Sequence, residues 1–289
     1  MRRSWLPVGL LTTEFIGGPP AEIEASPGPV LPANLPPMLE AMLWGLVQGL
    51  TEFLPISSSG HLVLVPAFLG LEPPDLATSA LLHMGTLAAV LIYYRKDLAK
   101  MVHFRRDPEA RHIVILLIIG TVPAAIGIVF EKQLELFQES VTAVAVALLF
   151  TGVVLLVSGF IVRKAKILEQ ASVTDSLLVG VAQATALLPG ISRSGMTITA
   201  ALGRGLSAEQ AARFSFLLAV PAIAGGGLIE TVQLAGNGGI PAQSWVGVLV
   251  AAVSGYLAIA FLIRTLVRIG LRPFALYCFV VGSLALILQ

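Results

Sequence analysis

The hydrophobic positions of this chain fall into long apolar segments that are separated by short polar or basic ones. Six of these segments approach the length of a membrane span; they cover residues 76–94, 113–130, 141–162, 211–229, 245–263 and 273–288. About 20 apolar residues in a helix cross a hydrocarbon core that is ~30 Å thick. The pattern therefore predicts an all-α polytopic membrane protein.

Two further apolar segments, residues 38–70 and 173–206, are interrupted by polar residues. The first interruption is QGLTEFLPISSSGH at 48–61, and the second is QATALLPGISRSGMT at 183–197. Polar side chains and a broken backbone persist at membrane depth only when they are buried in protein or line a cavity. We therefore predict two re-entrant helix pairs, each with its polar break in the middle of the membrane.

The two broken segments match each other at a constant offset of 135 residues. The matched positions are Gly45/Gly180, Gln48/Gln183, Ser57/Ser192, Ser59/Ser194, Gly60/Gly195, Gly70/Gly205 and Leu71/Leu206. The register predicts two repeats: repeat 1 spans 38–162 (pair 38–70; spans 76–94, 113–130, 141–162) and repeat 2 spans 173–289 (pair 173–206; spans 211–229, 245–263, 273–288). Each repeat has three spans after its pair, so repeat 2 is expected to be inverted.

The charges of the connecting segments set the expected orientation. Basic residues gather in segments 95–111, 163–172 and 264–272, whereas the alternating segments 131–140 and 231–244 hold one, Lys132. Loops rich in Lys and Arg stay in the cytoplasm. The two broken pairs then enter the membrane from opposite faces and meet at its midplane, as in other inverted-repeat membrane proteins.

Composition agrees with a membrane protein and narrows its partners. The chain is 56% hydrophobic and only 12% charged, with a mean hydropathy of +0.88. Its net charge of +1 gives no sign of a nucleic-acid partner, and a single cysteine, Cys278, excludes an internal disulfide. Residues 1–37 are a separate extension with seven prolines between 19 and 37, a composition that predicts an extended or disordered segment.

Glu52 and Arg193 are the only formal charges well inside the apolar segments, and two interpretations of them stand side by side. One is a structural ion pair that fixes the packing of the repeats. The other is an anion site, because a guanidinium binds two phosphate oxygens at once and helix N-termini favour anions. The side chains or amides available for such a site belong to Ser57, Ser58, Ser59, Gly60, Gly190, Ser192, Ser194 and Gly195.

Several other residues have open roles. In an anion site Glu52 is a general base or a ligand for Mg²⁺ or Ca²⁺. His61 is either a general acid or phosphate contact or a satisfied core histidine, and His83 is expected to be structural. Thr197 either contacts the substrate or bonds its own helix, and Gln48 is expected to hydrogen-bond broken backbone beside the site. The four histidines, at 61, 83, 103 and 112, show no metal-ligand spacing.

From Leu39 to the C-terminus the sequence resembles the undecaprenyl-diphosphate phosphatase, or bacitracin-resistance, family. The resemblance rests on Gln48-xxx-Glu52, PISSSGH at 55–61, PGISRSGMT at 189–197 and FSFLLAVP at 214–221. It implies a membrane hydrolase that removes the terminal phosphate of a lipid diphosphate, depends on a divalent cation and confers bacitracin resistance. Carried over by position, the family's functional residues fall on Glu52, Ser57, Ser58, His61 and Arg193. We therefore predict four catalytic residues, Glu52, Ser58, His61 and Arg193, and substrate contacts from Gln48, Ser57, Ser59, Gly60, Ser192, Ser194, Gly195 and Thr197.

One departure from the family pattern concerns the metal. Many members have a first glutamate where this chain has Gln48, which makes a two-carboxylate metal site doubtful. The expected enzyme lies in the bacterial cytoplasmic membrane, recycles the lipid carrier of peptidoglycan synthesis, and forms homodimers or acts alone. An inverted repeat suits a lipid flippase or anion-coupled transporter equally well, and the residues alone leave open whether a serine or a water is the nucleophile.

Overall fold

The computed structural model describes residues 35–127, 140–162, 164–236 and 240–288. The regular secondary structure of this part of the chain consists of helices and one isolated bridge between Lys166 and Leu206. The expected extension falls mainly on residues 1–34, which lie outside the described ones. The helices are α1 (Pro37–Phe53), α2 (Ser58–Leu69), α3 (Leu76–Tyr93), α4 (Arg95–Val102), α5 (Pro108–Gly127), α7 (Val141–Ser158), η2 (Leu168–Gln170), α8 (Val173–Thr185), α9 (Arg193–Gly203), α10 (Ala208–Gly236), α11 (Ala242–Arg268) and α12 (Arg272–Ile287).

Both broken segments are pairs of short helices joined by a tight turn. Helix α1 ends at Phe53, just before Pro55, and α2 begins after Ser57, which has a positive φ of 69°. Helix α8 ends at Thr185, and α9 begins after Ser192, with Gly190 at φ 92° in the turn. Proline cannot continue a helix, and a positive φ reverses the chain locally. The breaks therefore lie at the polar motifs.

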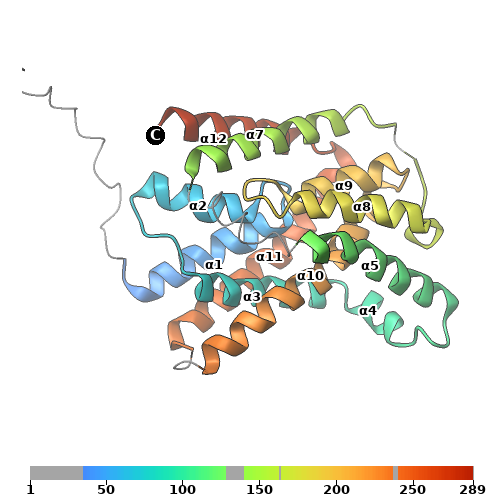
Figure 1. The fold of residues 1–289 in the computed structure, drawn as a ribbon, viewed down its shortest axis with the longest axis horizontal. Helices are drawn as coiled ribbons and strands as arrows, with labels where there is room; N and C mark the ends of the chain where they lie inside the picture. Colours follow the sequence, from blue (N-terminus) through green and yellow to red (C-terminus); the bar gives the residue numbers. More distant parts are fainter. Residues whose placement is uncertain (1–34, 128–139, 163, 237–239, 289) are drawn as a thin grey trace, which may run out of the picture.

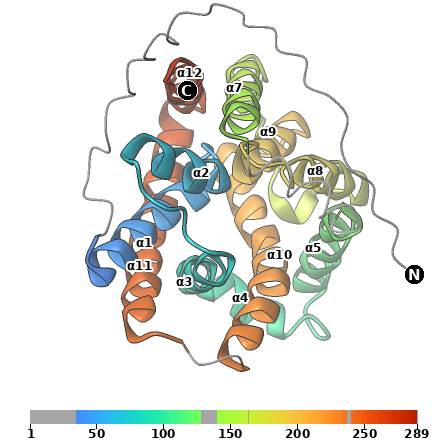
Figure 2. The same cartoon turned by 60° about the vertical axis from the view of Figure 1, so that its left-hand side comes forward.

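The helices pack against one another in pairs. Helix α1 packs mainly on α11, and α8 packs mainly on α5, while α3 lies against α10 and α7 against α12. Figure 2 shows α1 with α11 on one side, α5 with α8 on the other, and α7 beside α12. Small residues allow these helices to approach closely: a Cβ added at Gly45 or at Gly180 would lie 2.4 Å from a carbonyl oxygen of the facing helix.

The helix lengths fit a polytopic membrane protein. Among the described residues, α5, α7 and α11 are long and apolar enough to cross a membrane by themselves, and α3 qualifies together with α4, although the two are bent by 78°. Helices α10 and α11, with 29 and 27 residues, are longer than the expected segments 211–229 and 245–263. Part of segment 95–111, which we expected to be a connection, is helical because it forms α4 and the start of α5.

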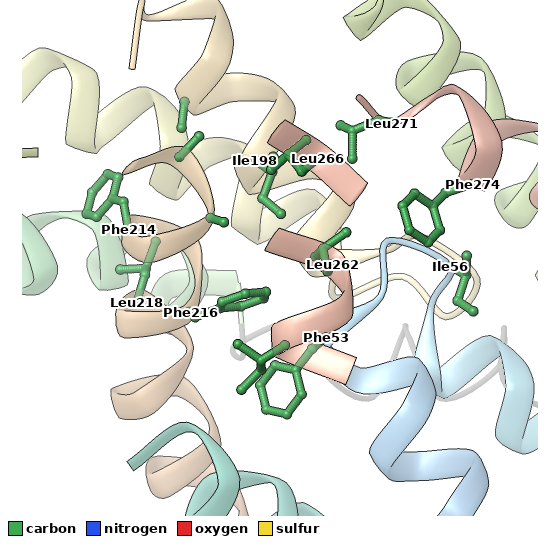
Figure 3. Close-up of a cluster of buried hydrophobic side chains, with 14 of the residues drawn as sticks. Phe53, Ile56, Ile198, Phe214, Phe216, Leu218, Leu262, Leu266, Leu271 and Phe274 are labelled. Atoms are coloured by element: carbon green, nitrogen blue, oxygen red, sulfur yellow. The ribbon is translucent and has the colours of Figure 1, made fainter. Parts of the chain in front are cut away.

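The largest buried apolar cluster lies between the two broken pairs and helices α10 and α11. Figure 3 shows Phe53 of α1 and Phe216 of α10 close to Leu262 of α11, with Ile198 of α9 beyond. The rings of Phe53 and Phe216 meet edge to face at 5.4 Å, and both side chains are buried. Because Phe53 follows Glu52 directly, this packing fixes the end of α1 and the direction of its last carboxylate.

An ion-pair cluster ties together three segments near the start of α10. Arg213 of α10 donates to Asp97 of α4 at 2.5 Å and to Glu169 of η2 at 2.8 Å. Burial by itself raises the pKa of Glu169, but hydrogen bonding to Arg213 lowers it overall. Two of the basic segments therefore meet at one end of the helix bundle, on the right in Figure 1.

Candidate active site

The turns of the two broken pairs contact each other inside the bundle. The Ser194 hydroxyl of α9 donates to the carbonyl oxygen of Leu54, at the end of α1, over 3.1 Å. A Cβ added at Gly60 would lie 3.2 Å from Cα of Gly190, so the two turns touch through backbone. The second turn is also held from α7, because the Thr151 hydroxyl donates to the carbonyl of Gly190 at 3.0 Å. Polar groups that are 140 residues apart in the chain are thus in direct contact inside the bundle.

Glu52 is the centre of the hydrogen bonds at this meeting point. Its Oε2 atom accepts from the hydroxyl of Ser58 at 2.5 Å and from Nε2 of Gln48 at 2.9 Å. Its Oε1 atom accepts from the guanidinium of Arg193 at 2.5 Å. The Glu52 side chain is 5% exposed and that of Arg193 is 20% exposed. The ion pair therefore joins the two broken pairs, and its arginine remains partly accessible.

The serines of both turns divide into two types. Ser57 and Ser192 cap their helices, because each hydroxyl accepts from an amide three residues later, Gly60 or Gly195, at 3.2 Å. These two capping serines are buried. Ser58, in contrast, is half-buried and directs its hydroxyl to Glu52. Ser58 therefore contacts the carboxylate of Glu52, whereas the two capping serines bond the backbone of their own helices.

The N-termini of α2 and α9 add backbone donors. The amides of Ser58 and Ser59 in α2, and of Arg193 and Ser194 in α9, make no hydrogen bond within the part of the chain that the structure describes. The first amides of a helix lack intrahelical partners and carry its positive dipole end, so they attract anions. The Ser57–Ser59 and Ser192–Ser194 hydroxyl pairs lie 3.3 and 3.2 Å apart at the same two ends.

His61 is held on both ring nitrogens. Nδ1 bonds the carbonyl of Ser57 at 2.8 Å, and Nε2 bonds the hydroxyl of Tyr277 at 2.8 Å. The ring is 4% exposed and stacks on the Tyr277 ring. Tyr277 lies on α12, and nothing in its apolar surroundings distinguishes it in the sequence from an aromatic residue that faces lipid. Only the distance between two side chains, 216 positions apart, identifies it as the partner of His61.

Two more residues complete the surroundings. His83 of α3 approaches Glu52, with Nε2 at 3.8 Å from Oε2. The Thr197 hydroxyl donates to the carbonyl of Arg193 at 2.7 Å and pairs with the Ser215 hydroxyl at 2.6 Å. Thr197 therefore bonds its own helix in this structure, the second of the two roles open to it. Gln183, the counterpart of Gln48, is buried, and its amide has no partner among the described residues.

A family model described as "Bacitracin resistance protein BacA" matches residues 41–284. The chain belongs to this family. A relative from Halothermothrix orenii named "Undecaprenyl-diphosphatase" is 41% identical over 87% of this chain and 98% of its own length. Relatives of the same name from Rubrobacter xylanophilus and Thermomicrobium roseum are 43% and 42% identical, each over 86% of this chain and 96% of their own length. The family match therefore reaches from the second turn of α1 to the last turn of α12.

The side chains of this BacA-family site do not fit a resident divalent cation. Both oxygens of Glu52 already accept from donors, and the adjacent guanidinium of Arg193 repels a cation. Gln48 adds one buried oxygen, Oε1, for which the described residues provide no hydrogen-bond partner. Within the described residues no three acidic, histidine or cysteine side chains gather as ligands, whereas Mg²⁺ and Ca²⁺ prefer six or more oxygens. No chemical step below is therefore assigned to a protein-bound metal.

A second buried carboxylate lies at the start of α8, at the edge of the expected segment 173–206. Asp175, in the first turn of α8, is 1% exposed and pairs with Lys166. It also accepts from Nε of Arg204 at 2.7 Å and from the amide of Ser172 at 2.8 Å. These contacts fix the outer end of the second broken pair. The BacA-family chain thus has one polar cluster at the turns and another at the start of α8.

Proposed function

We propose that this protein is an integral membrane phosphatase that hydrolyses undecaprenyl diphosphate to undecaprenyl phosphate and phosphate. Two findings support this function: the chain belongs to the family, and it matches relatives named undecaprenyl-diphosphatase over nearly their whole length. In a bacterium the reaction returns the lipid carrier to peptidoglycan synthesis, and it counteracts bacitracin, in keeping with the family description. The bacterial cytoplasmic membrane is the proposed location.

The observation that carries the proposal is the contact between Ser58, Glu52 and Arg193. A hydroxyl that donates to a buried carboxylate at 2.5 Å is a nucleophile with its general base in place. A partly accessible guanidinium within reach of the same carboxylate is a binding group for phosphate oxygens. Nucleophile, base and anion receptor thus lie together at a site built from two helix N-termini, which suits phosphoryl transfer.

In the proposed reaction, Arg193 turns from Glu52 to the diphosphate. The amides of Ser58, Ser59, Arg193 and Ser194 bind further oxygens. The Ser58 oxygen attacks the terminal phosphorus while its proton passes to Glu52 Oε2, and the bond from phosphorus to the bridging oxygen breaks. Undecaprenyl phosphate leaves, and water then releases phosphate from Ser58. Attack by a water that Glu52 activates is the alternative first step, and trapping of phosphate on Ser58 distinguishes the two.

The remaining expected site residues have supporting roles in this proposal. Ser57 and Ser192 shape the two helix starts through their caps, and Gln48 orients Glu52. Gly60 and Gly195 donate their amides to these caps, and Ser59 and Ser194 lie beside the oxygens that enter. His61, braced by Tyr277, holds the carbonyl of Ser57 and thereby the turn before the nucleophile. A divalent cation would have to be held by the diphosphate oxygens and water, where it would neutralise phosphate charge, because the side chains of the site do not fit one.

The two repeats are proposed to have opposite orientations in the membrane. The equivalent packing of α1 on α11 and of α8 on α5 supports a twofold relation between residues 38–162 and 173–289. Single cysteines at Lys96, Lys164 or Arg268 in a Cys278→Ser background are expected to resist an impermeant thiol reagent in intact cells, and to react after permeabilisation. Labelling of all three from outside would reverse the orientation.

The decisive experiment is phosphate release from undecaprenyl diphosphate by the purified protein in detergent. A transporter or flippase moves nothing across detergent, so release there separates hydrolysis from transport. We expect release by the parent chain and none by Glu52→Gln at equal expression and monodispersity. Absence of release by the well-folded parent, with and without added Mg²⁺ or Ca²⁺, would contradict the proposed function. The oligomeric state, a monomer or a homodimer, follows from the mass of the same sample.

A further inference from the structure

The histidine that the sequence favours for proton transfer, His61, has no nitrogen available. A ring nitrogen that bonds a carbonyl oxygen must carry the hydrogen, so Nδ1–H of His61 donates to Ser57. Its Nε2 then accepts from the Tyr277 hydroxyl. The ring is buried among these contacts, at 4% exposure. Proton exchange with substrate or water would first require breaking one of these two bonds.

His83 has the opposite properties. Its Nδ1 bonds the carbonyl of Ser79 at 2.7 Å, which places the hydrogen on Nδ1 and the lone pair on Nε2. No hydrogen bond joins Nε2 to the part of the chain that the structure describes, and it lies 3.8 Å from Glu52 Oε2. The side chain is 32% exposed. A polar ring left open within a membrane span is costly unless it lines a water-filled cavity, so His83 marks the accessible side of Glu52.

The same carboxylate oxygen serves both neighbours. Oε2 of Glu52 accepts from Ser58 at 2.5 Å and faces Nε2 of His83 at 3.8 Å. A movement of about 1 Å brings this second pair to the hydrogen-bond distance of roughly 2.8 Å. The order Ser58, Glu52, His83 therefore leads from the half-buried nucleophile to a partly exposed base, through one oxygen atom.

We propose that His83 takes from Glu52 the proton that Ser58 gives up, and passes it to water. This inference rests on the proposed phosphatase function. When the Ser58 oxygen bonds to phosphorus, its proton reaches Glu52 Oε2. Transfer of that proton to Nε2 of His83 leaves a carboxylate and an imidazolium, and water then removes the proton from the ring. Glu52 is again negative, so it takes a proton from the water that attacks the phosphoserine and returns it to the Ser58 oxygen as the bond from that oxygen to phosphorus breaks.

The other repeat shows that packing does not demand a histidine here. At the constant offset of 135 residues, position 83 corresponds to Leu218, which is completely buried in α10. At the same offset, Leu187 is the residue that corresponds to Glu52. Histidine and glutamate thus occur together in the first half and leucines occupy both places in the second. The histidine thus occurs in the repeat that carries the catalytic carboxylate, as expected if His83 acts through Glu52.

The test compares phosphate release by three variants. His83→Gln keeps a polar side chain of similar length but cannot take up a proton, and we expect its turnover to fall roughly 10- to 100-fold with little change in KM. His83→Ala is expected to lose as much and to regain activity with added imidazole, to a degree that follows the basicity of substituted imidazoles. His103→Gln is the control, because His103 bonds the carbonyl four residues earlier in the same way but lies on the exposed end of α4.

The outcomes separate this inference from the function on which it rests. A parent protein that releases no phosphate contradicts the function itself. With an active parent, parent-like turnover of His83→Gln overturns the relay. A slow His83→Ala that imidazole does not accelerate, together with an active His83→Gln, makes His83 only a hydrogen-bonding support for Glu52. If His83→Ala fails to fold, the turnover of His83→Gln decides.

Discussion

The two broken helix pairs have the same backbone plan and different chemistry. Both end in a turn, a capping serine and a short helix, yet the first carries Glu52 where the second carries Leu187. The second contributes Arg193 instead and is fixed at its far end through Asp175. At the position matching Asp175, the first pair has Glu40, whose carboxylate accepts a 3.4 Å hydrogen bond from Trp44 and has no ion pair among the described residues. The first pair thus holds the base and the nucleophile. The second pair is anchored at its far end and contributes the guanidinium of Arg193.

The largest effect is expected where the two pairs differ most, at Glu52. Glu52→Gln keeps the size of the side chain but removes the base, so turnover should fall roughly 10³-fold or more. Leu187→Met, at the matched position, should leave turnover within about twofold, because Met substitutes for Leu with little strain. Phosphate release at equal monodispersity measures both. Substantial activity of Glu52→Gln would reduce the ion pair to a structural contact.

Arg193 tests whether the second pair contributes geometry or only charge. Charge-assisted hydrogen bonds are worth about 1.5–3 kcal/mol each, so Arg193→Lys, which loses bidentate binding, should slow turnover roughly 10- to 100-fold. Arg193→Ala should be slower still, because Glu52 then remains buried without its partner. Steady-state phosphate release by the two variants gives the comparison. A lysine variant at the parent rate would mean that Arg193 is simply a counter-charge.

Asp175 tests the anchoring of the second pair. Asp175→Asn weakens the contacts with Lys166 and Arg204, and we expect the free energy of unfolding to drop by about 1.5–3 kcal/mol. The measurement is the thermal unfolding midpoint in detergent. Glu40→Gln, the matched change in the first pair, should leave the midpoint nearly unchanged. Equal shifts for the two variants would remove the distinction between an anchored and an unanchored pair.

The smallest effects are expected at the matched glutamines. Gln48→Met removes a 2.9 Å hydrogen bond to Glu52 and should slow turnover severalfold. Gln183→Met replaces a buried amide that has no partner among the described residues, so it should preserve activity and raise the unfolding midpoint slightly. Activity and midpoint are read on the same samples. If Gln183→Met lost activity and Gln48→Met did not, our assignment of the carboxylate site to the first broken pair would be wrong.

Periodicity and charge predicted the all-helical membrane fold because long apolar segments have few alternatives in lipid. The closeness of Glu52 and Arg193 also followed from sequence, since each charge needs a partner there. The contact of Tyr277 with His61 and the partly exposed position of His83 could not be predicted, because they depend on how α12 and α3 rotate against the broken pairs. Asp175 was missed because its partners, Lys166 and Arg204, lie in the connection before α8 and just after α9 and become neighbours only on folding.

The ion pair between Arg193 and Glu52 also has a consequence for the release of product. The carboxylate is a built-in competitor of the substrate: it is tethered beside the guanidinium, so its effective concentration there is high at every moment. A diphosphate with several charged oxygens displaces it, because it also gains the helix amides. Inorganic phosphate, once detached from its lipid, offers fewer contacts against the same competitor. The resting contact therefore favours departure of the small product and keeps an empty site electrically neutral within the membrane.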